Sequence, residues 1–208
     1  MKKRHSRKAD ARNRARVRSA TNNAVFLVGF MGAGKSSVGR ALGRRLNWLF
    51  EDLDDRIEQR EGRRVAEIFR GSGEPAFRRA ERLALEQALE QLQGGVPRII
   101  ALGGGAFIQP SIAELLETSG VPTVFLDASV EELWQRCCRQ AAESRTERPL
   151  LKDLDQFRRL YDSRRQSYLK ASLKIQTGNR TVDAIAAEIA EKLGLETIAL
   201  RTELGESE

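Results

Sequence analysis

The apolar residues of this chain gather in short runs separated by longer amphipathic stretches. Ala24–Val28 is an uninterrupted apolar run that ends at a glycine, which is typical of a strand buried on both faces. Between Lys35 and Leu46 the apolar residues instead recur at helical spacing. Further buried strands are predicted at 48–51, 98–102, 123–127 and 173–176, and further helices at 54–61, 74–93, 111–118, 129–141, 154–171 and 181–194.

This alternation of strands and helices predicts an α/β fold, with a parallel sheet of about five strands and helices on both faces. A chain of 208 residues is long enough for one well-buried domain and short for two. We expect that domain at 23–195, followed by a polar tail at 196–208. No apolar segment is long enough to span a bilayer, so we expect no membrane partner.

The positive charge is concentrated at one end of the chain. The net charge is +7, but residues 1–20 hold nine basic residues and one acid, and the remaining residues hold 27 basic and 28 acidic groups. The domain is therefore close to neutral, and a nucleic-acid partner is not expected for it. For the basic arm, 1–22, three interpretations stay open: a solvated disordered extension, which we favour, a contact arm for nucleic acid or an acidic partner, and a transit peptide.

Histidine and spaced-cysteine chemistry is excluded for the predicted domain. The one histidine, His5, lies in the basic arm, so the domain has no imidazole base and no histidine metal site. Cys137 and Cys138 are adjacent, which gives neither a zinc cluster nor a disulfide framework, and we expect both to be inert on a packed helix. This cysteine usage favours a reducing compartment, and we expect a cytoplasmic protein.

A phosphate-binding loop follows the first predicted strand. Residues 29–36 read G-x-x-x-x-G-K-S and open the first predicted helix, a context that makes the match specific. Glycines let the backbone point successive N–H groups at phosphate oxygens, and the helix N-terminus adds partial positive charge. Lys35 is expected on the β- and γ-phosphates and the Ser36 hydroxyl on Mg²⁺. The residues expected to contact ATP here are Gly32, Ala33, Gly34, Lys35, Ser36 and Ser37.

A triphosphate site alone does not identify the reaction. A GTPase switch needs D-x-x-G and N-K-x-D motifs, and no aspartate here is followed three positions later by glycine, nor does an Asn-Lys pair occur. Phosphoryl transfer to a small acceptor is therefore the leading class.

Two carboxylates close the second predicted strand. Asp52 and Asp54 are two residues apart, and on a strand they share one face at the carboxyl end of the sheet, where ligands bind. One could organise the water shell of Mg²⁺ and the other could accept a proton from an acceptor hydroxyl. A helix N-cap explains the same pattern equally well, since acids are common where a helix begins.

Two later segments favour a substrate site. Gly103, Gly104 and Gly105 follow the third predicted strand and leave bare backbone at its carboxyl end, although a simple loop needs no ligand. Arg148 closes a polar stretch from about Gln140, which suggests a mobile lid that carries an arginine to the transferring phosphoryl group. Without the phosphate loop this stretch would be an ordinary surface loop.

Five motifs together resemble the shikimate kinase family. They are the phosphate loop, F-x-D-x-D at 50–54, G-E-x-x-F-R-x-x-E at 73–81, the triple glycine and R-P-L-L at 148–151, in the family's order and approximate spacing. Each motif is weak alone, but five in register over 23–195 are specific. The resemblance implies phosphorylation of the 3-hydroxyl of shikimate by ATP with Mg²⁺, a step toward chorismate and the aromatic amino acids.

The resemblance also implies roles for individual residues. Asp54 would hold the acceptor hydroxyls and could act as base, while Asp52 would organise Mg²⁺ through water. Arg78 and Arg164 would grip the shikimate carboxylate, the latter through an R-x-x-x-Y pattern that neighbouring Arg165 makes ambiguous. Gly103, Gly104 and Gly105 would line the substrate, and Arg148 would be the lid arginine. Taken alone, Arg78 would more often be a solvated helix residue paired with glutamates.

Departures from the family pattern affect the adenine side. The stretch from Trp134 to Arg148 is longer than the usual approach to the lid, so Arg139 is only our choice for the arginine that stacks on adenine. Arg180 would flank the adenine from the other side. We expect a monomer with shikimate and ATP as its partners. Two alternatives are another small-metabolite kinase, of gluconate or a nucleoside monophosphate, and a kinase-like regulator that uses the basic arm.

Overall fold

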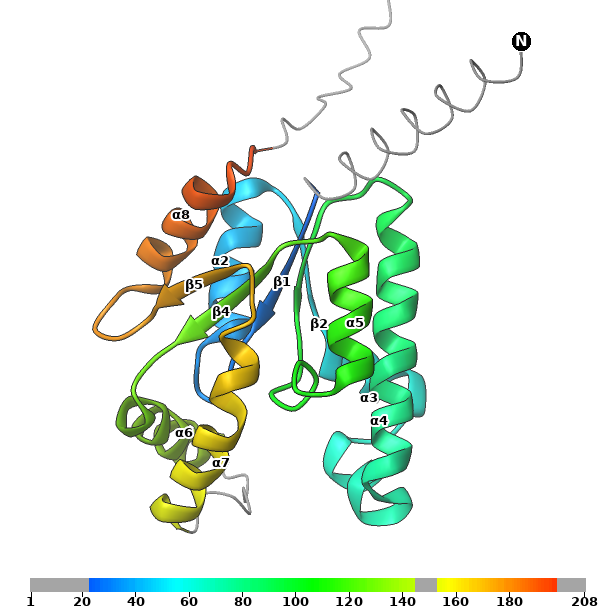
Figure 1. Ribbon diagram of the computed structural model, residues 1–208, viewed down its shortest axis with the longest axis vertical. Coiled ribbons are helices and arrows are strands. Elements are labelled where there is room, and N and C mark those ends of the chain that lie inside the picture. The colour runs from blue at the N-terminus through cyan, green and yellow to red at the C-terminus, as the bar shows by residue number, and fades with distance from the viewer. Residues whose placement is uncertain (1–22, 145–152, 198–208) are drawn as a thin grey trace, which may run out of the picture.

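Five parallel strands form the centre of the computed structural model, which describes residues 23–144 and 153–197 (Figure 1). The order across the sheet is β2-β3-β1-β4-β5. The strands are β1 (Ala24–Val28), β2 (Leu49–Asp52), β3 (Arg98–Ala101), β4 (Thr123–Asp127) and β5 (Leu173–Gln176). The parallel α/β architecture predicted from the apolar runs is confirmed.

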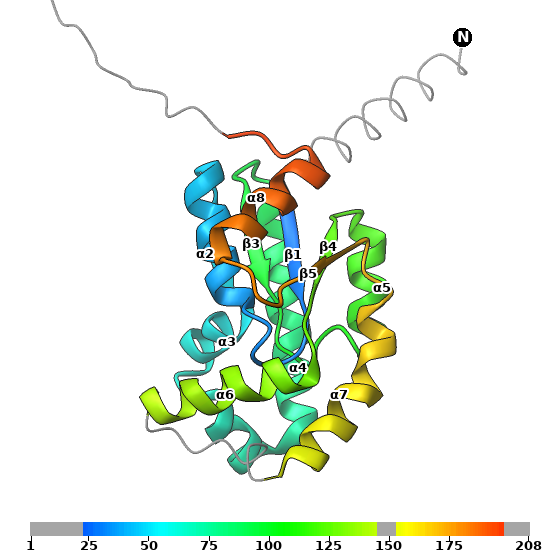
Figure 2. The ribbon, with the colours of Figure 1, turned by 90° about the vertical axis from the view of Figure 1, so that its left-hand side faces the viewer.

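Helices cover the sheet from both sides (Figures 1 and 2). Helices α2 (Lys35–Leu46) and α8 (Val182–Leu193) pack against each other over one face, and α4 (Val65–Leu92) and α5 (Pro110–Ser119) cover the other. Helices α3 (Leu53–Glu61), α6 (Val130–Ser144) and α7 (Leu154–Tyr168) lie toward the carboxyl ends of the strands. Within the described ranges, none of these helices has the length and apolar character that crossing a bilayer requires.

The two outer strands are less buried than the sequence indicated. Strands β1 and β4 are buried along their whole length, as predicted. In contrast, β5 buries only Ile175 fully, and Leu49 at the start of β2 is 52% exposed. Both strands are sheet edges, so the expectation of complete burial is wrong for them, because a run of apolar residues does not show whether a strand has one neighbour or two.

Helix α4 is longer than predicted and is interrupted. The predicted helix, 74–93, matches its second part, but the helical turns before Gly73 were not expected. Gly73 has φ 77° and ψ 168°, and Pro75 follows in the next turn, so the chain breaks helical geometry there and starts again. This break places the first turn of the second segment, with Arg78, beside the carboxyl ends of the strands.

The sheet brings two glycine-rich turns together at its carboxyl edge. Because β1 and β3 are neighbours, with Leu27 opposite Ala101, the turns that leave these strands are adjacent. The N–H of Leu102 donates to the carbonyl of Leu27 at 3.0 Å, which carries the pairing into the turns. The connection that leaves β1 runs through α2 on one face of the sheet, and the connection that leaves β3 runs through α5 on the other. Such a switch point is where open α/β folds bind ligands.

Candidate active site

The phosphate loop is held tightly by its surroundings. Gly34 has φ +91° and caps α2, whose first hydrogen bond runs from Val38 N–H to Gly34 O at 2.8 Å. Gly32 has φ +79°, and a Cβ there would lie 2.7 Å from the carbonyl of Leu133 and 2.8 Å from the sulfur of Cys137. A side chain at position 32 is therefore excluded both by the backbone angle and by the close packing of the loop against α6.

Lys35 reaches back across the same loop. Its Nζ donates to the carbonyl of Gly29 at 2.9 Å and to that of Phe30 at 3.2 Å. Desolvation lowers the pKa of this ammonium, while the nearby carboxylates of Asp54 and Asp52 oppose the decrease. Lys35 is thus already oriented over the loop where phosphate oxygens would meet the backbone amides.

Asp52 has two partners at once. Its Oδ2 accepts a hydrogen bond of 2.7 Å from the Ser36 hydroxyl, and its Oδ1 accepts one of 3.2 Å from the N–H of Asp54. The second bond makes Asp52 the N-cap of α3. The N-cap interpretation of Asp52 is therefore confirmed, and the contact with Ser36 places the same carboxylate beside the phosphate loop. Its role toward Mg²⁺ stays a prediction.

The prediction that Asp54 lies on the second strand is wrong, although its carboxylate does face Gly103 in the turn after β3. Strand β2 ends at Asp52, and Asp54 stands in the first turn of α3, so strand alternation does not orient it. Its Oδ1 is buried without a hydrogen-bond partner and would lie 2.9 Å from a Cβ on Gly103. Burial, together with repulsion from Asp52 and Glu81, raises the pKa of Asp54 to about 6.

Arg78 makes the ion pairs of a helix residue and also faces the glycine turn. On α4 its guanidinium pairs with Glu74 and with Glu81, each at 2.8 Å, as a helix residue among glutamates would. The same group faces Gly105, where a Cβ would lie 2.8 Å from Nη2. Its side chain is 21% exposed. The glycine therefore leaves one side of the guanidinium open toward the turn after β3.

The geometry separates Arg164 from Arg165. Arg164 Nη1 donates to the carbonyl of Gly104 at 3.3 Å, and its guanidinium lies 5.7 Å from the centre of the Phe30 ring. Tyr168, the last residue of the R-x-x-x-Y pattern, also donates to the Gly104 carbonyl, and burial raises the pKa of its hydroxyl to about 12. Arg165 instead turns toward Asp127 at the end of β4. Arg164 is thus the arginine at the glycine turn.

Two residues at this turn were not assigned from the sequence. Glu81 is 1% exposed, and its Oε1 has no hydrogen-bond partner and would lie 2.8 Å from a Cβ on Gly103. Gln109 donates to Glu81 Oε2 at 2.6 Å and to Gly105 O at 3.3 Å. The G-E-x-x-F-R-x-x-E pattern contains Glu81 and could have indicated it, whereas no sequence signal pointed to Gln109.

The adenine-side residues are placed less closely. Arg139 is exposed on α6, and Arg180 donates to the carboxylate of Glu188 on α8. An unassigned residue, Arg136, joins α6 to the loop after β5 by donating to the Thr177 carbonyl at 2.8 Å. Helix α6 and the 177–180 loop are therefore in contact. Arg148 and the R-P-L-L motif lie outside the described residues, so the lid stays a prediction.

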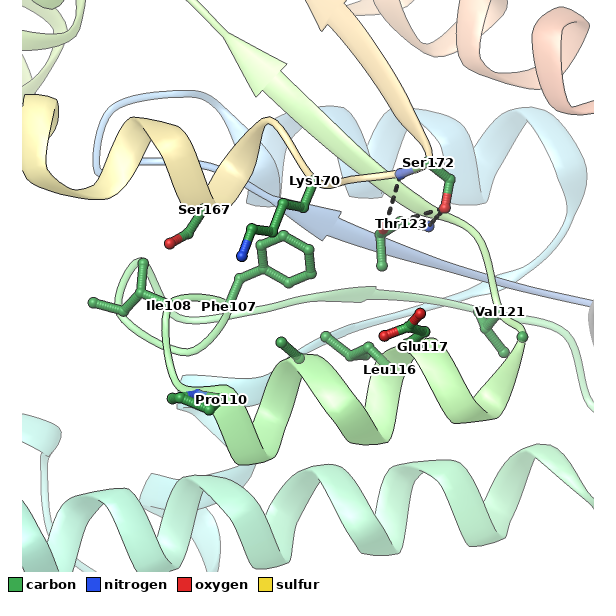
Figure 3. A pocket seen from close by; sticks show the side chains of 12 residues that line it. Phe107, Ile108, Pro110, Leu116, Glu117, Val121, Thr123, Ser167, Lys170 and Ser172 are labelled. Atoms are coloured by element: carbon green, nitrogen blue, oxygen red, sulfur yellow. Dashed lines mark hydrogen bonds between the residues drawn. The ribbon is translucent and has the colours of Figure 1, made fainter.

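A separate cavity of about 480 Å³ lies between α5 and the segment that joins α7 to β5 (Figure 3). Phe107, Leu116 and Lys170 are among its lining residues. It shares no lining residue with the predicted site. This cavity is therefore distinct from the residues gathered at the carboxyl edge of the sheet.

The fold and this edge define a class of protein: a P-loop kinase, with a cluster of arginines and carboxylates beside its phosphate loop. The sequence model of the shikimate kinase family matches residues 31–194. The chain belongs to the shikimate kinase family.

Individual relatives agree with this assignment. A shikimate kinase from Thermus thermophilus is 41% identical over 172 residues, which cover 81% of this chain and 89% of that protein. A solved shikimate kinase from Acinetobacter baumannii in complex with shikimate superposes with a TM-score of 0.73 at 31% identity, covering 82% of this chain and 92% of that one. A gluconokinase from Sinorhizobium meliloti, at 17% identity and a TM-score of 0.51 over 84% of this chain and 93% of that one, shares the fold alone.

Proposed function

We propose that this chain transfers the γ-phosphoryl group of ATP to the 3-hydroxyl of shikimate, giving ADP and shikimate 3-phosphate. Membership of the shikimate kinase family supports the reaction. The observation that carries the site assignment is the turn at 103–105. Unpartnered oxygens of Asp54 and Glu81 face Gly103, while the guanidinium groups of Arg164 and Arg78 face Gly104 and Gly105.

On the nucleotide side, the loop amides and Lys35 take the phosphates. Lys35 would exchange its two carbonyl partners for the β- and γ-phosphate oxygens, which carry far more negative charge. Arg139 and Arg180 would border the adenine, since α6 and the 177–180 loop are in contact. Arg148 would reach the transferring group from the lid. The loop residues assigned to ATP are Gly32, Ala33, Gly34, Lys35, Ser36 and Ser37.

The donor set beside the loop fits Mg²⁺. Among the described residues no group of three or more carboxylates, histidines or cysteines could hold a metal ion. A hydroxyl and one carboxylate, Ser36 and Asp52, instead lie 2.7 Å apart, and Mg²⁺ favours few protein ligands together with water and substrate phosphates. Ser36 would bind the ion directly and Asp52 would hold its water. The ion supplies charge neutralisation for the phosphates.

On the acceptor side, the positive charges of two arginines match the negative charge of shikimate. A carboxylate accepts two parallel hydrogen bonds from a guanidinium, so Arg78 and Arg164 suit the acid group of shikimate. Asp54 suits its hydroxyls. With a pKa of about 6, this carboxyl is mostly ionised at neutral pH and can accept a hydrogen bond from the 3-hydroxyl. As the hydroxyl oxygen bonds to phosphorus, the bond from phosphorus to the bridging oxygen of ADP breaks, and the hydroxyl proton passes to Asp54.

The remaining assignments extend this proposal to the whole chain. The kinase domain would span 23–195 and act as a monomer in the cytoplasm, with the basic arm outside the catalytic unit. A gluconate or nucleoside monophosphate kinase would be expected to lack the paired arginines combined with the triple-glycine turn. A regulator that had lost activity would be expected to lack at least one site residue, yet Lys35, Ser36, Asp52, Asp54 and Arg78 are all present.

A coupled assay for ADP tests the reaction. The purified chain is supplied with ATP and Mg²⁺, and with shikimate, gluconate or an analogue of shikimate that lacks the 3-hydroxyl. We expect ADP only with shikimate. ADP release with gluconate but not with shikimate would show that the chain is a gluconate kinase. Equal ADP release with the deoxy analogue would show that the 3-hydroxyl is not the acceptor.

A further inference from the structure

Arg164, one of the two arginines assigned to the shikimate carboxylate, is carried by α7, which is separate from the phosphate loop and the glycine turn. Arg164 meets Gly104 through one hydrogen bond of 3.3 Å, and its Nε is buried without a partner. A single bond leaves a long side chain free to turn unless the backbone beneath it is fixed. The position of α7 therefore controls where this guanidinium lies.

Tyr161 lies three residues before Arg164 and so stands on the same side of α7. Its hydroxyl donates to Asp127 Oδ1, on the last residue of β4, at 3.1 Å and lies 3.2 Å from the carbonyl of Ala128. The same hydroxyl accepts a hydrogen bond of 3.2 Å from Arg165 Nε. The tyrosine is 6% exposed. It is thus a buried polar link between α7 and the central sheet.

Asp127 is held firmly at its own end of this link. Lys174 Nζ on β5 lies 2.9 Å from Asp127 Oδ2, Gln176 donates to the same oxygen at 3.1 Å, and Arg165 lies 3.5 Å away. Burial would raise the pKa of this carboxyl, but the hydrogen bonds from Lys174 and Tyr161 outweigh burial and lower it. Asp127 is therefore a charged, fixed acceptor for the tyrosine hydroxyl.

The ring of Tyr161 makes a second contact that leads to the same arginine. It packs edge-on against Phe30 of the phosphate loop, with centres 5.5 Å apart and planes at 79°. The Arg164 guanidinium lies over that same phenylalanine. One side chain thus fixes both the helix that carries Arg164 and the ring beneath its guanidinium.

We propose that Tyr161, anchored on Asp127, is a positioning residue that sets the guanidinium of Arg164 for the acceptor carboxylate. This role rests on the proposed function, since it takes Arg164 as a shikimate ligand. Tyr161 itself reaches neither substrate; it acts through Arg164. Its removal therefore changes the affinity for shikimate and leaves the affinity for ATP alone.

The test is a double-mutant cycle of Tyr161→Phe and Arg164→Lys, with KM for each substrate, kcat and Tm measured for every variant. Phenylalanine keeps the ring and removes only the hydroxyl. We expect Tyr161→Phe to raise KM for shikimate about three- to tenfold, because the hydrogen bonds of this hydroxyl are lost while the ring stays, with KM for ATP changed less than about twofold. In the Arg164→Lys background, which itself raises KM for shikimate, Tyr161→Phe should have almost no further effect.

Two controls separate positioning from general loosening. Ser163→Ala removes an exposed hydroxyl from the same helix, bonded at 2.8 Å to Leu160 O, and should leave both KM values unchanged. Asp162→Asn changes an exposed carboxylate on the same helix that has no part in the link to Asp127, and it should also leave both KM values unchanged.

Each other outcome overturns the inference. An equal effect of Tyr161→Phe in both arginine backgrounds would show that it acts elsewhere, as would a change in Tm alone. If Ser163→Ala or Asp162→Asn raises KM for shikimate as much as Tyr161→Phe, general loosening of α7 and not the hydroxyl bond is the cause. If the wild type is active but Arg164→Lys leaves KM for shikimate unchanged, Arg164 does not bind shikimate, and Tyr161 has no shikimate ligand to position. A wild type with no shikimate-dependent ADP formation refutes the proposed function instead.

Discussion

The carboxylates of Asp54 and Glu81 face the same glycine. A Cβ on Gly103 would lie 2.9 Å from Asp54 Oδ1 and 2.8 Å from Glu81 Oε1, and both oxygens are buried without hydrogen-bond partners. A buried carboxylate oxygen without a hydrogen-bond partner raises the free energy of the folded protein. A bound hydroxyl would donate the hydrogen bond that these oxygens lack.

Gly103→Ala tests this arrangement. The added methyl group would enter the space between the two carboxylates, so we expect kcat/KM for shikimate to fall by about two orders of magnitude, the effect of a small misplacement at the reacting centre. Gly71→Ala is the matched control, because its Cβ would come no closer than 3.9 Å to a neighbouring atom. Steady-state kinetics of both variants decide, and a fully active Gly103→Ala variant would contradict the placement of the acceptor.

Asp54→Asn should reduce kcat by about two to four orders of magnitude, the usual contribution of a general base. The amide cannot take the hydroxyl proton, while ATP binding, measured by calorimetry, should survive. Asp55→Asn changes the neighbouring exposed carboxylate on the same helix and should keep nearly full activity. Similar losses in the two variants would show that charge at the start of α3, and not Asp54 chemistry, matters.

The raised pKa of Asp54 predicts the acid limb of the activity profile. Since the ionised form accepts the hydroxyl proton, kcat/KM for shikimate should fall as pH decreases through about 6, with the slope of a single protonation. A pH profile of the wild type checks this. If activity instead falls only near pH 4, the raised pKa of Asp54 in the substrate-free protein does not control the reaction.

The same shift predicts a gain in stability when the charge is removed. The folded-state pKa of Asp54 lies above the ordinary 3.8, so its effect on stability is absent below that value and becomes unfavourable as pH rises through about 6. At pH 8, Asp54→Asn should therefore raise the free energy of unfolding by about 1 to 3 kcal/mol. Urea unfolding at pH 8 and pH 4 measures it, and the gain should vanish at the lower pH.

Arg78→Lys should raise KM for shikimate about tenfold or more, because an ammonium cannot form the paired hydrogen bonds of a guanidinium with a carboxylate. KM for ATP should stay within twofold. Arg79→Lys, at an exposed position next to it on α4, is the matched control. If both variants behave like the wild type, the carboxylate is gripped elsewhere.

Deletion of residues 1–20 should leave kcat/KM unchanged, because none of the residues assigned to the site lies there. The deleted segment carries a charge of +8 and the remaining residues carry −1. Steady-state kinetics at low and at physiological salt measure the effect. A large loss would show that the arm takes part in catalysis.

The sequence predicted the sheet well because periodicity is a local property. Ala24–Val28, Thr123–Asp127 and Leu173–Gln176 were predicted with the bounds that the structure gives them. Edge exposure at Leu49 was missed because strand order depends on the crossover connections, which a run of apolar residues does not encode. The helical turns before Gly73 were missed because a glycine and a proline together suggest a loop.

The site was predictable where a motif fixes the backbone and less so elsewhere. The phosphate loop and the 103–105 turn follow from glycine chemistry, and Arg78 and Arg164 from the family pattern. Asp54 was identified by strand alternation, yet a helix start places it, because the cap formed by Asp52 ends the strand earlier. Gln109 reaches the site from a loop whose path no local pattern describes.

The fit between Gly32 and the sulfur of Cys137 offers a practical handle on this enzyme. A bulkier residue at position 137 would press on Gly32 and distort the phosphate loop, while the glycine turn at 103–105 would keep its shape. Such a variant would bind the organic acid but not the nucleotide. The complex with the acid alone could then be studied by crystallography or calorimetry.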